Sequence, residues 1–175
     1  MFEKIKQWFF YRDFKKNARS QAQEQRGINP LQSICILFDG TSEDERKIVH
    51  MFKKSISGDN GREIKSLAFI DNALPLDNID CNAYNLKNIT WTGKPFGEKI
   101  EEFINYKFDL MIILTKKMLP HFEYIVAHAQ SKFLIGPSIE HAEKYFNITV
   151  DSAENETTDD QLKKIIKAIN KIAIK

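Results

Sequence analysis

The sequence is poor in the residues that build phosphate-binding loops, disulfide frameworks and metal sites. Its 175 residues include seven glycines, two cysteines and four histidines. No G-x-G-x-x-G or G-x-x-x-x-G-K-[ST] pattern occurs, which excludes the two common glycine-rich nucleotide loops. Cys35 and Cys81 have no second cysteine at C-x-x-C spacing, so we expect two free thiols in a reducing compartment. The histidines form no metal-ligand cluster, and we predict neither a metal ion nor another cofactor.

Long hydrophobic runs are also lacking. No segment approaches the roughly 18 consecutive apolar residues that a membrane-spanning helix needs. Near the N-terminus the apolar run at 8–11 is shorter than the core of a secretory signal. We therefore expect a cytoplasmic protein without a transmembrane segment.

Apolar runs of strand length alternate with amphipathic segments of helix length over most of the chain. The run 110–114 is apolar without alternation, which is typical of a parallel strand that is buried on both faces. Apolar residues at helical spacing over 122–129 and a second run at 133–135 follow, so 108–138 is predicted to be a β-α-β unit. The pattern predicts an α/β fold, a three-layer Rossmann-like sandwich with a mostly parallel sheet.

The other elements are predicted from the same periodicities and from turn residues. Phe96 is expected on the inward face of a helix that continues through Phe103. Residues 71–88 are polar and irregular and predict no element. We expect further strands and helices as follows: strands at 34–38, 64–70, 89–91 and 148–150, and helices beginning near 43, 96, 139 and 158.

The first 27 residues differ from the rest in charge. They carry seven basic and three acidic residues, which leaves 19 basic and 21 acidic residues in 28–175. All of the excess positive charge therefore lies in one segment, which predicts an anionic partner. We predict a basic, aromatic helical arm at 1–29 and a Rossmann-like domain at 30–175. Aromatic and basic residues interleave on several sides of this helix, which suits stacking on RNA bases.

Ligands of parallel α/β sheets bind at the carboxyl ends of the strands. Asp39, Thr115 and Ser138 lie at predicted strand ends and are the candidates for a small-molecule site. Lys116 and Lys117 follow a buried strand and could hold an anion, although a solvated turn before a helix is the commoner explanation for such a pair. Asp39 could equally cap its own turn.

The last predicted helix carries a regular row of lysines. Lys163, Lys164, Lys167 and Lys171 lie within about 100° of one another around the helix axis. They form either a solvated face or a basic strip that contacts phosphates.

Two resemblances follow from longer patterns. The segments FDLMIILT, AHAQSKFLIGPS and FNITV resemble the acceptor half of heptosyltransferase-like glycosyltransferases, but the donor domain of those enzymes has no counterpart in these residues. Residues 30–172, with Thr92-Gly93-Lys94 ahead of a helix and Phe108-Asp109 at the start of a strand, resemble a family of small uncharacterised proteins from Bacteroidetes-type bacteria. That second resemblance implies a possible role as an accessory protein of the large ribosomal subunit.

We therefore predict a non-enzymatic RNA-binding protein, with ribosomal RNA and neighbouring ribosomal proteins as partners. Nothing in the sequence indicates DNA binding. The alternatives are a peripheral membrane protein that uses the same arm and a small enzyme with a sugar- or nucleotide-type site at the strand ends. The predicted RNA-binding residues are Lys4, Lys6, Trp8, Phe10, Tyr11, Arg12, Lys15, Lys16, Arg19, Arg26, Lys163, Lys164, Lys167 and Lys171.

Overall fold

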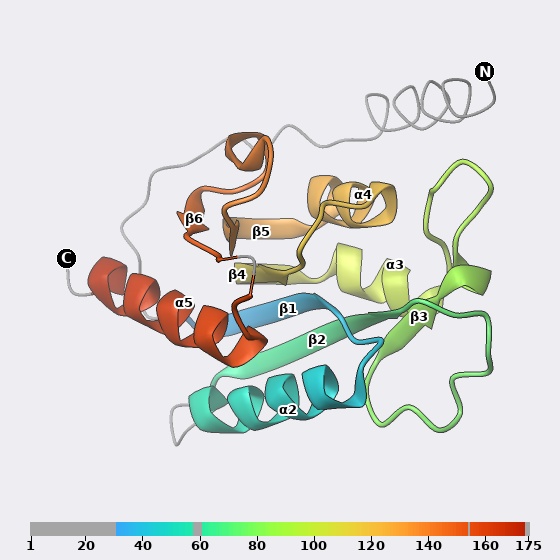
Figure 1. The fold of residues 1–175 in the computed structure, drawn as a ribbon, viewed down its shortest axis with the longest axis horizontal. Helices are drawn as coiled ribbons and strands as arrows, with labels where there is room; N and C mark the ends of the chain where they lie inside the picture. The colour runs from blue at the N-terminus through green and yellow to red at the C-terminus, as the bar shows by residue number, and fades with distance from the viewer. Residues whose placement is uncertain (1–30, 58–60, 154, 174–175) are drawn as a thin grey trace.

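The computed structural model describes residues 31–57, 61–153 and 155–173, with side chains up to residue 170. Within these ranges six strands alternate with four α-helices (Figure 1). The strands are β1 (Ser33–Asp39), β2 (Glu63–Ile70), β3 (Ala83–Asn85), β4 (Lys107–Leu114), β5 (Gln130–Pro137) and β6 (Ile148–Val150). The helices are α2 (Glu43–Ser57), α3 (Glu98–Asn105), α4 (Pro120–His128) and α5 (Thr158–Ala173). The predicted arm at 1–29 lies outside these residues.

The strands form one sheet in the order β3-β2-β1-β4-β5-β6, and every neighbouring pair is parallel. After β3 the chain crosses back and lays β4 beside β1, in a register that pairs Ile36 with Ile112. The sheet is therefore doubly wound, with its switch point between β1 and β4. The predicted α/β fold is confirmed, and the sheet of the described residues is wholly parallel.

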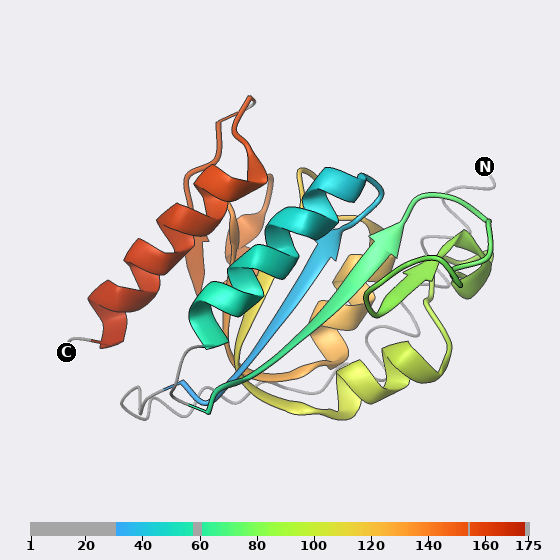
Figure 2. The same ribbon diagram turned by 90° about the horizontal axis from the view of Figure 1, so that it is seen from below.

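Helices cover both faces of the sheet (Figures 1 and 2). In β4, Leu110, Ile112 and Leu114 face the apolar cluster that includes residues of α2 and α5. Met111 and Ile113 face the cluster that includes residues of α3 and α4. All five side chains are at most 4% exposed. Each contributes roughly 1.5–3 kcal/mol by burial, so both layers depend on this strand.

Asp109, near the start of β4, ties three strands together at their amino ends. Its Oδ2 accepts hydrogen bonds from the N–H groups of Gln32 and Ser33 at 2.9 and 3.0 Å, and its Oδ1 accepts one from Lys132 Nζ at 2.6 Å. Burial alone would raise the pKa of Asp109. The hydrogen bonds from the ammonium and the two backbone groups outweigh burial and lower the pKa to about 2.

Asp109→Asn is expected to lower the free energy of unfolding at pH 7 by about 2 kcal/mol, because the ionised carboxylate is favoured in the folded state. The stabilisation is present above the unfolded pKa of this carboxyl and is lost as pH falls towards 2. Urea unfolding measures the change. Asp159→Asn is the control: this carboxylate is exposed and pairs with Lys163 within α5, so it should change stability by less than about 0.5 kcal/mol. Equal urea midpoints for the two variants would contradict the prediction.

Two predicted elements were wrong. Residues 89–91 are not a strand: Ile89 forms an isolated antiparallel bridge with Pro95, while the third strand is β3. With three residues, β3 is too short to show an apolar run. It ends at Asn85, whose side chain caps the 3-10 turn that follows. The helix predicted from 139 shrinks to a 3-10 turn at Ala142–Lys144, because His141 before it is left-handed with φ 59°.

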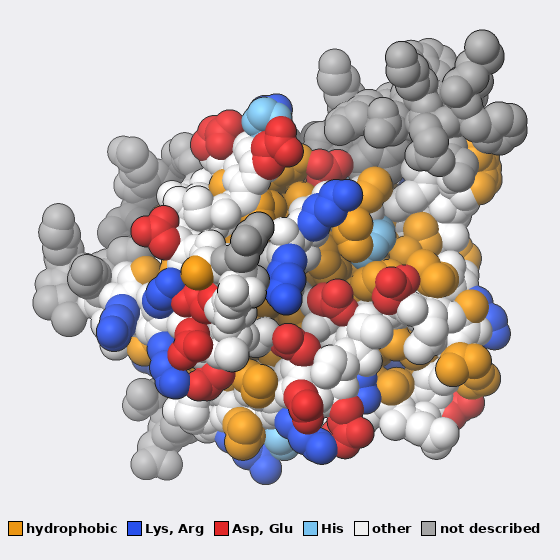
Figure 3. All heavy atoms as spheres, viewed as in Figure 1, with side chains coloured by type: hydrophobic (Ala, Val, Ile, Leu, Met, Phe, Trp, Pro, Cys, Tyr) orange, Lys and Arg blue, Asp and Glu red, His pale blue; other side chains and the backbone are white. Residues whose placement is uncertain are grey.

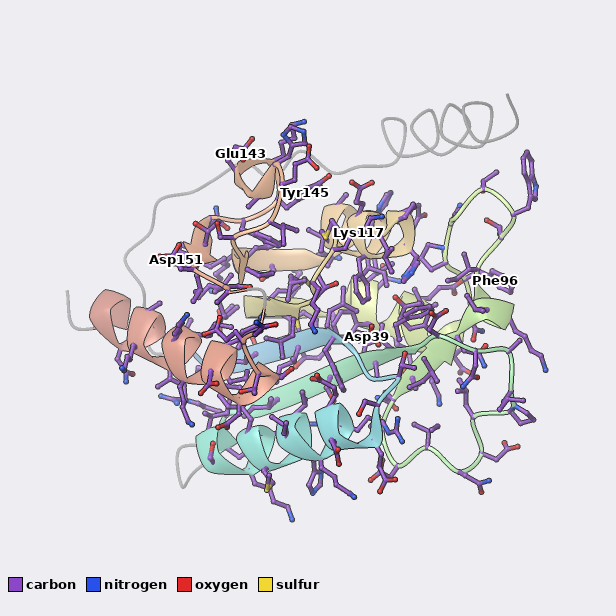
Figure 4. All side chains as sticks on the ribbon, in the orientation of Figure 1. Asp39, Phe96, Lys117, Glu143, Tyr145 and Asp151 are labelled. Atoms are coloured by element: carbon purple, nitrogen blue, oxygen red, sulfur yellow. The ribbon has the colours of Figure 1, made fainter. Side chains whose placement is uncertain are left out.

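The predicted helix near 96 begins two residues later than expected. Gly97, with φ 122°, forms the turn ahead of α3, and Phe96 lies outside the helix with 46% of its surface exposed (Figure 4). Ile100 and Phe103 form the buried face of α3.

Candidate functional site at the carboxyl edge of the sheet

The switch point between β1 and β4 is where this fold binds ligands in other proteins. Figure 4 labels Asp39 and Lys117, which lie at the end of β1 and just after β4. In the view of Figure 3, lysine and arginine side chains alternate with aspartate and glutamate, so this face carries no continuous basic patch.

The loop after β1 is closed by its own hydrogen bonds. Asp39 Oδ1 accepts from the N–H of Thr41 at 3.0 Å, and Thr41 Oγ1 accepts from the N–H of Asp71 at 2.9 Å. Arg46 caps the loop from α2 by donating to the carbonyl oxygens of Gly40 and Thr41, at 2.5 and 3.2 Å. The loop thus uses its polar groups to hold the ends of β1 and β2 together, as the turn-cap alternative requires.

The loop after β4 is also a closed turn. Thr115 is buried, and its Oγ1 donates to the carbonyl oxygen of Lys117 at 2.7 Å. Lys116 and Lys117 extend from this turn into solvent. At the end of β5, the N–H of Ser138 donates to the carbonyl oxygen of Val150. Asp39, Thr115 and Ser138 therefore each form local structural bonds, and no described hydrogen bond joins one to another.

A buried polar pair that no sequence pattern predicts lies near this edge. Tyr84 of β3 and His121 of α4 are 1% and 6% exposed, and the Tyr84 hydroxyl lies 2.8 Å from His121 Nδ1. The ring of Phe69 lies 4.3 Å from the imidazole, centroid to centroid. Burial lowers the pKa of His121 to about 4, although the charge of Asp39 opposes the shift. Burial and the same carboxylate raise the pKa of Tyr84.

Both groups of the pair are therefore neutral at pH 7. A neutral imidazole can accept the phenolic proton or donate one, but it adds no charge for an anion to meet. His121 is almost fully buried, which nothing in its local sequence predicts. Its partner, Tyr84, lies within 71–88, where no helix or strand was predicted. The spacing of residues in the sequence therefore could not predict that the two side chains meet.

Metal ligation has no support in the part of the chain that the structure covers. No group of three or more His, Cys, Asp or Glu side chains there could hold a metal ion. Cys35 and Cys81 are free thiols, as expected. No described helix is both long and apolar enough to cross a membrane.

The predicted RNA-binding residues fall into two groups. Lys4, Lys6, Trp8, Phe10, Tyr11, Arg12, Lys15, Lys16, Arg19 and Arg26 lie outside the described residues, as does the side chain of Lys171. On α5, Lys163 pairs with Asp159 at 2.6 Å, and Lys164 pairs with Glu156 at 2.5 Å. Lys167 is exposed. Neighbouring carboxylates thus partly neutralise the described part of this strip.

The fold and the switch point define a doubly wound, Rossmann-like α/β protein. The chain belongs to a family of unknown function, DUF6913, whose model matches residues 3–172. Comparison with curated proteins and with solved structures gave no significant match. The resemblance to an uncharacterised family is therefore confirmed, whereas no comparison connects the chain with ribosomal proteins or glycosyltransferases.

Proposed function

We propose that this protein binds structured RNA without catalysing a reaction and that its N-terminal arm anchors it there. The observation that carries the proposal is the charge division: seven basic against three acidic residues in 1–27, and a net negative remainder. Cationic side chains that meet phosphates displace counterions, which gives affinity without a preformed pocket. Ribosomal RNA and neighbouring ribosomal proteins are the proposed partners.

Two further observations support an arm-centred function. The family model begins at residue 3, so the arm belongs to the pattern that defines the family. In the domain, polar groups of the candidate loops at the strand ends form hydrogen bonds within those loops. On α5, Lys163 and Lys164 form ion pairs with acidic side chains. The excess of basic over acidic residues in the sequence lies at 1–27, and that segment is the place to test.

Deletion of residues 1–27 is expected to abolish co-sedimentation with ribosomes while the domain stays folded by circular dichroism. Binding of the full chain should weaken about a thousandfold between 50 and 200 mM salt if some six phosphates are contacted. Replacing Trp8, Phe10 and Tyr11 by leucine keeps every charge of the arm. The variant therefore separates the contribution of base stacking to binding from that of charge. Co-sedimentation of the deletion variant at the wild-type level would refute the anchor role.

The same arm could instead meet an anionic membrane, and liposome flotation decides between the two partners. The proposal predicts that the full chain stays at the bottom of the gradient with anionic vesicles at the salt concentration where it sediments with ribosomes. The membrane would be favoured if the full chain floated with the vesicles, if deletion of 1–27 abolished this flotation, and if the full chain did not bind ribosomes.

A further inference from the structure

The outer edge of β2 is only partly covered. Its pairing with β3 begins at Ala68, so the described chain places no strand beside 63–67 on that side (Figure 2). The N–H of Ala68 donates to the carbonyl oxygen of Asn82 across this edge. In a parallel strand every second residue points its backbone groups to the same side, so those of Ile64 and Ser66 also face outward. This stretch presents donors and acceptors where a sheet normally has a neighbour.

A cleft of about 640 Å³ runs along this uncovered edge. Residues of α2 and α3 form its two sides, and the segment 79–82 lines it from outside. Buried side chains of Val49, Leu67 and Phe103 form part of its wall. The volume lies within the range of about 300–1,000 Å³ that is typical of small-molecule sites. It exceeds what a single inorganic ion fills.

Three cations enter the cleft without a carboxylate partner. They are Arg46 and Lys53 from α2 and Lys99 from α3. Among the described residues no carboxylate lies within ion-pair distance of any of the three. Lys53 donates to the hydroxyl of Ser66 at 3.1 Å, and Arg46 donates to backbone carbonyl oxygens, which are neutral partners.

The three cations act together on the thiol of Cys81, which also lines the cleft. Burial and the charge of Asp80 raise its pKa, while Arg46, Lys53 and Lys99 each lower it. Arg46 and Lys53 come from α2 and Lys99 from α3, and all three line the same cleft as Cys81. Such cations repel one another, and a bound anion would remove that repulsion.

We propose that the cleft along the edge of β2 binds a small phosphorylated molecule, with Arg46, Lys53 and Lys99 on its phosphate group. Lys65 also lines the cleft, but it pairs with Glu63 at 3.3 Å, so the three remaining cations face the carboxylates of Asp80 and Glu102 with an excess of one positive charge. That excess favours an anionic ligand, and the oxygens of a phosphate group can accept hydrogen bonds from several of these cations at once.

The rest of the ligand is a polar organic body. The cleft has room beyond the phosphate, and the outward backbone groups of Ile64 and Ser66 can hydrogen-bond to hydroxyl groups. An apolar body would leave those backbone groups without partners, at a cost in affinity. The site is separate from the proposed RNA anchor, since it uses no residue of 1–27.

Calorimetric titration of the full chain with ribose 5-phosphate, inorganic phosphate and ribose tests the assignment. Ribose 5-phosphate should bind saturably and more tightly than inorganic phosphate, and ribose should not bind. Lys53→Gln should weaken binding about tenfold, because it removes one charge-assisted hydrogen bond. Its neighbour Lys54 has the same charge but does not line the cleft, so Lys54→Gln should change affinity by less than about twofold.

Lys99→Gln is the second variant, because Lys99 is exposed and no described bond of the fold depends on it. It should weaken binding as Lys53→Gln does, with an unchanged melting temperature. Absence of binding by either phosphate compound at millimolar concentration would overturn the proposal. So would equal weakening by Lys53→Gln and Lys54→Gln, which would indicate general attraction to the basic chain. Equal affinity for inorganic phosphate and ribose 5-phosphate would overturn the assignment of an organic ligand.

Discussion

Gly136→Ala is expected to lower the free energy of unfolding by about 3 kcal/mol, at the upper end of what overpacking of a core costs. Gly136 lies in β5, directly beneath the ring of Phe146. A Cβ atom at this position would lie 2.4–2.6 Å from three carbons of that ring. Phe146 is buried, with 7% of its surface exposed, so the ring cannot move outward without exposing the cluster that it covers. Urea unfolding of wild type and variant measures the effect.

A double-mutant cycle identifies the cause. Phe146→Leu removes the ring atoms that the new methyl group would meet, and alone it should cost about 1–2 kcal/mol. Combined with Gly136→Ala it should cost clearly less than the sum, with a coupling of about 1–2 kcal/mol. Strict additivity would show that the alanine acts through the strand backbone instead. The Ile-Gly dipeptide of this strand, which contributed to the glycosyltransferase resemblance, thus has a packing reason.

The central elements were predictable because their sequences report burial directly. The run 110–114 lacks polar alternation since β4 has helices on both faces, and the positions of β1, β2, β5 and β6 follow from shorter apolar runs. In the sequence, Phe108-Asp109 is part of the pattern that resembles an uncharacterised family. The structure gives it a stabilising role, because Asp109 holds the amino ends of β1 and β5.

The edge of the sheet was not predictable in the same way. β3 has three residues, and its identity as a strand depends on pairing with residues 68–70, which no local pattern reports. Sheet order is likewise a tertiary property: the crossover that places β4 beside β1 leaves no mark on the spacing of apolar residues.

The candidate sites likewise combine features that are predictable from the sequence with features that depend on the folded structure. The expected topology correctly places Asp39 and Thr115 at strand ends, but whether either is available to a ligand depends on side-chain bonds within each turn. The cleft beside β2 draws its cations from two helices and one strand, far apart in sequence. Each lysine separately looks like a solvated surface residue, and only the folded chain brings them together.

Stability is expected to fall by about 3 kcal/mol as pH is lowered from 6.5 to 4, owing to His121. Its folded pKa is about 4, below the value of about 6.5 for an unfolded histidine. Between these values the unfolded chain binds a proton that the folded chain rejects, so acid favours unfolding. The loss begins near the unfolded pKa and is complete below the folded one. The effect of Asp109 lies at lower pH, since its folded pKa is about 2.

His121→Asn separates this contribution from other titrations. An asparagine side chain places a polar atom close to the position of imidazole Nδ1, so it can keep the hydrogen bond to Tyr84 while it cannot be protonated in this range. The difference in unfolding free energy between pH 7 and 4.5 should shrink by about 2–3 kcal/mol in this variant. Tyr84→Phe is the matched control, because it removes the hydrogen bond and keeps the imidazole, so its acid sensitivity should persist. If His121→Asn lost as much stability on acidification as wild type, the buried imidazole would not be the acid-sensitive group, and the loss would have to come from carboxylates elsewhere in the fold.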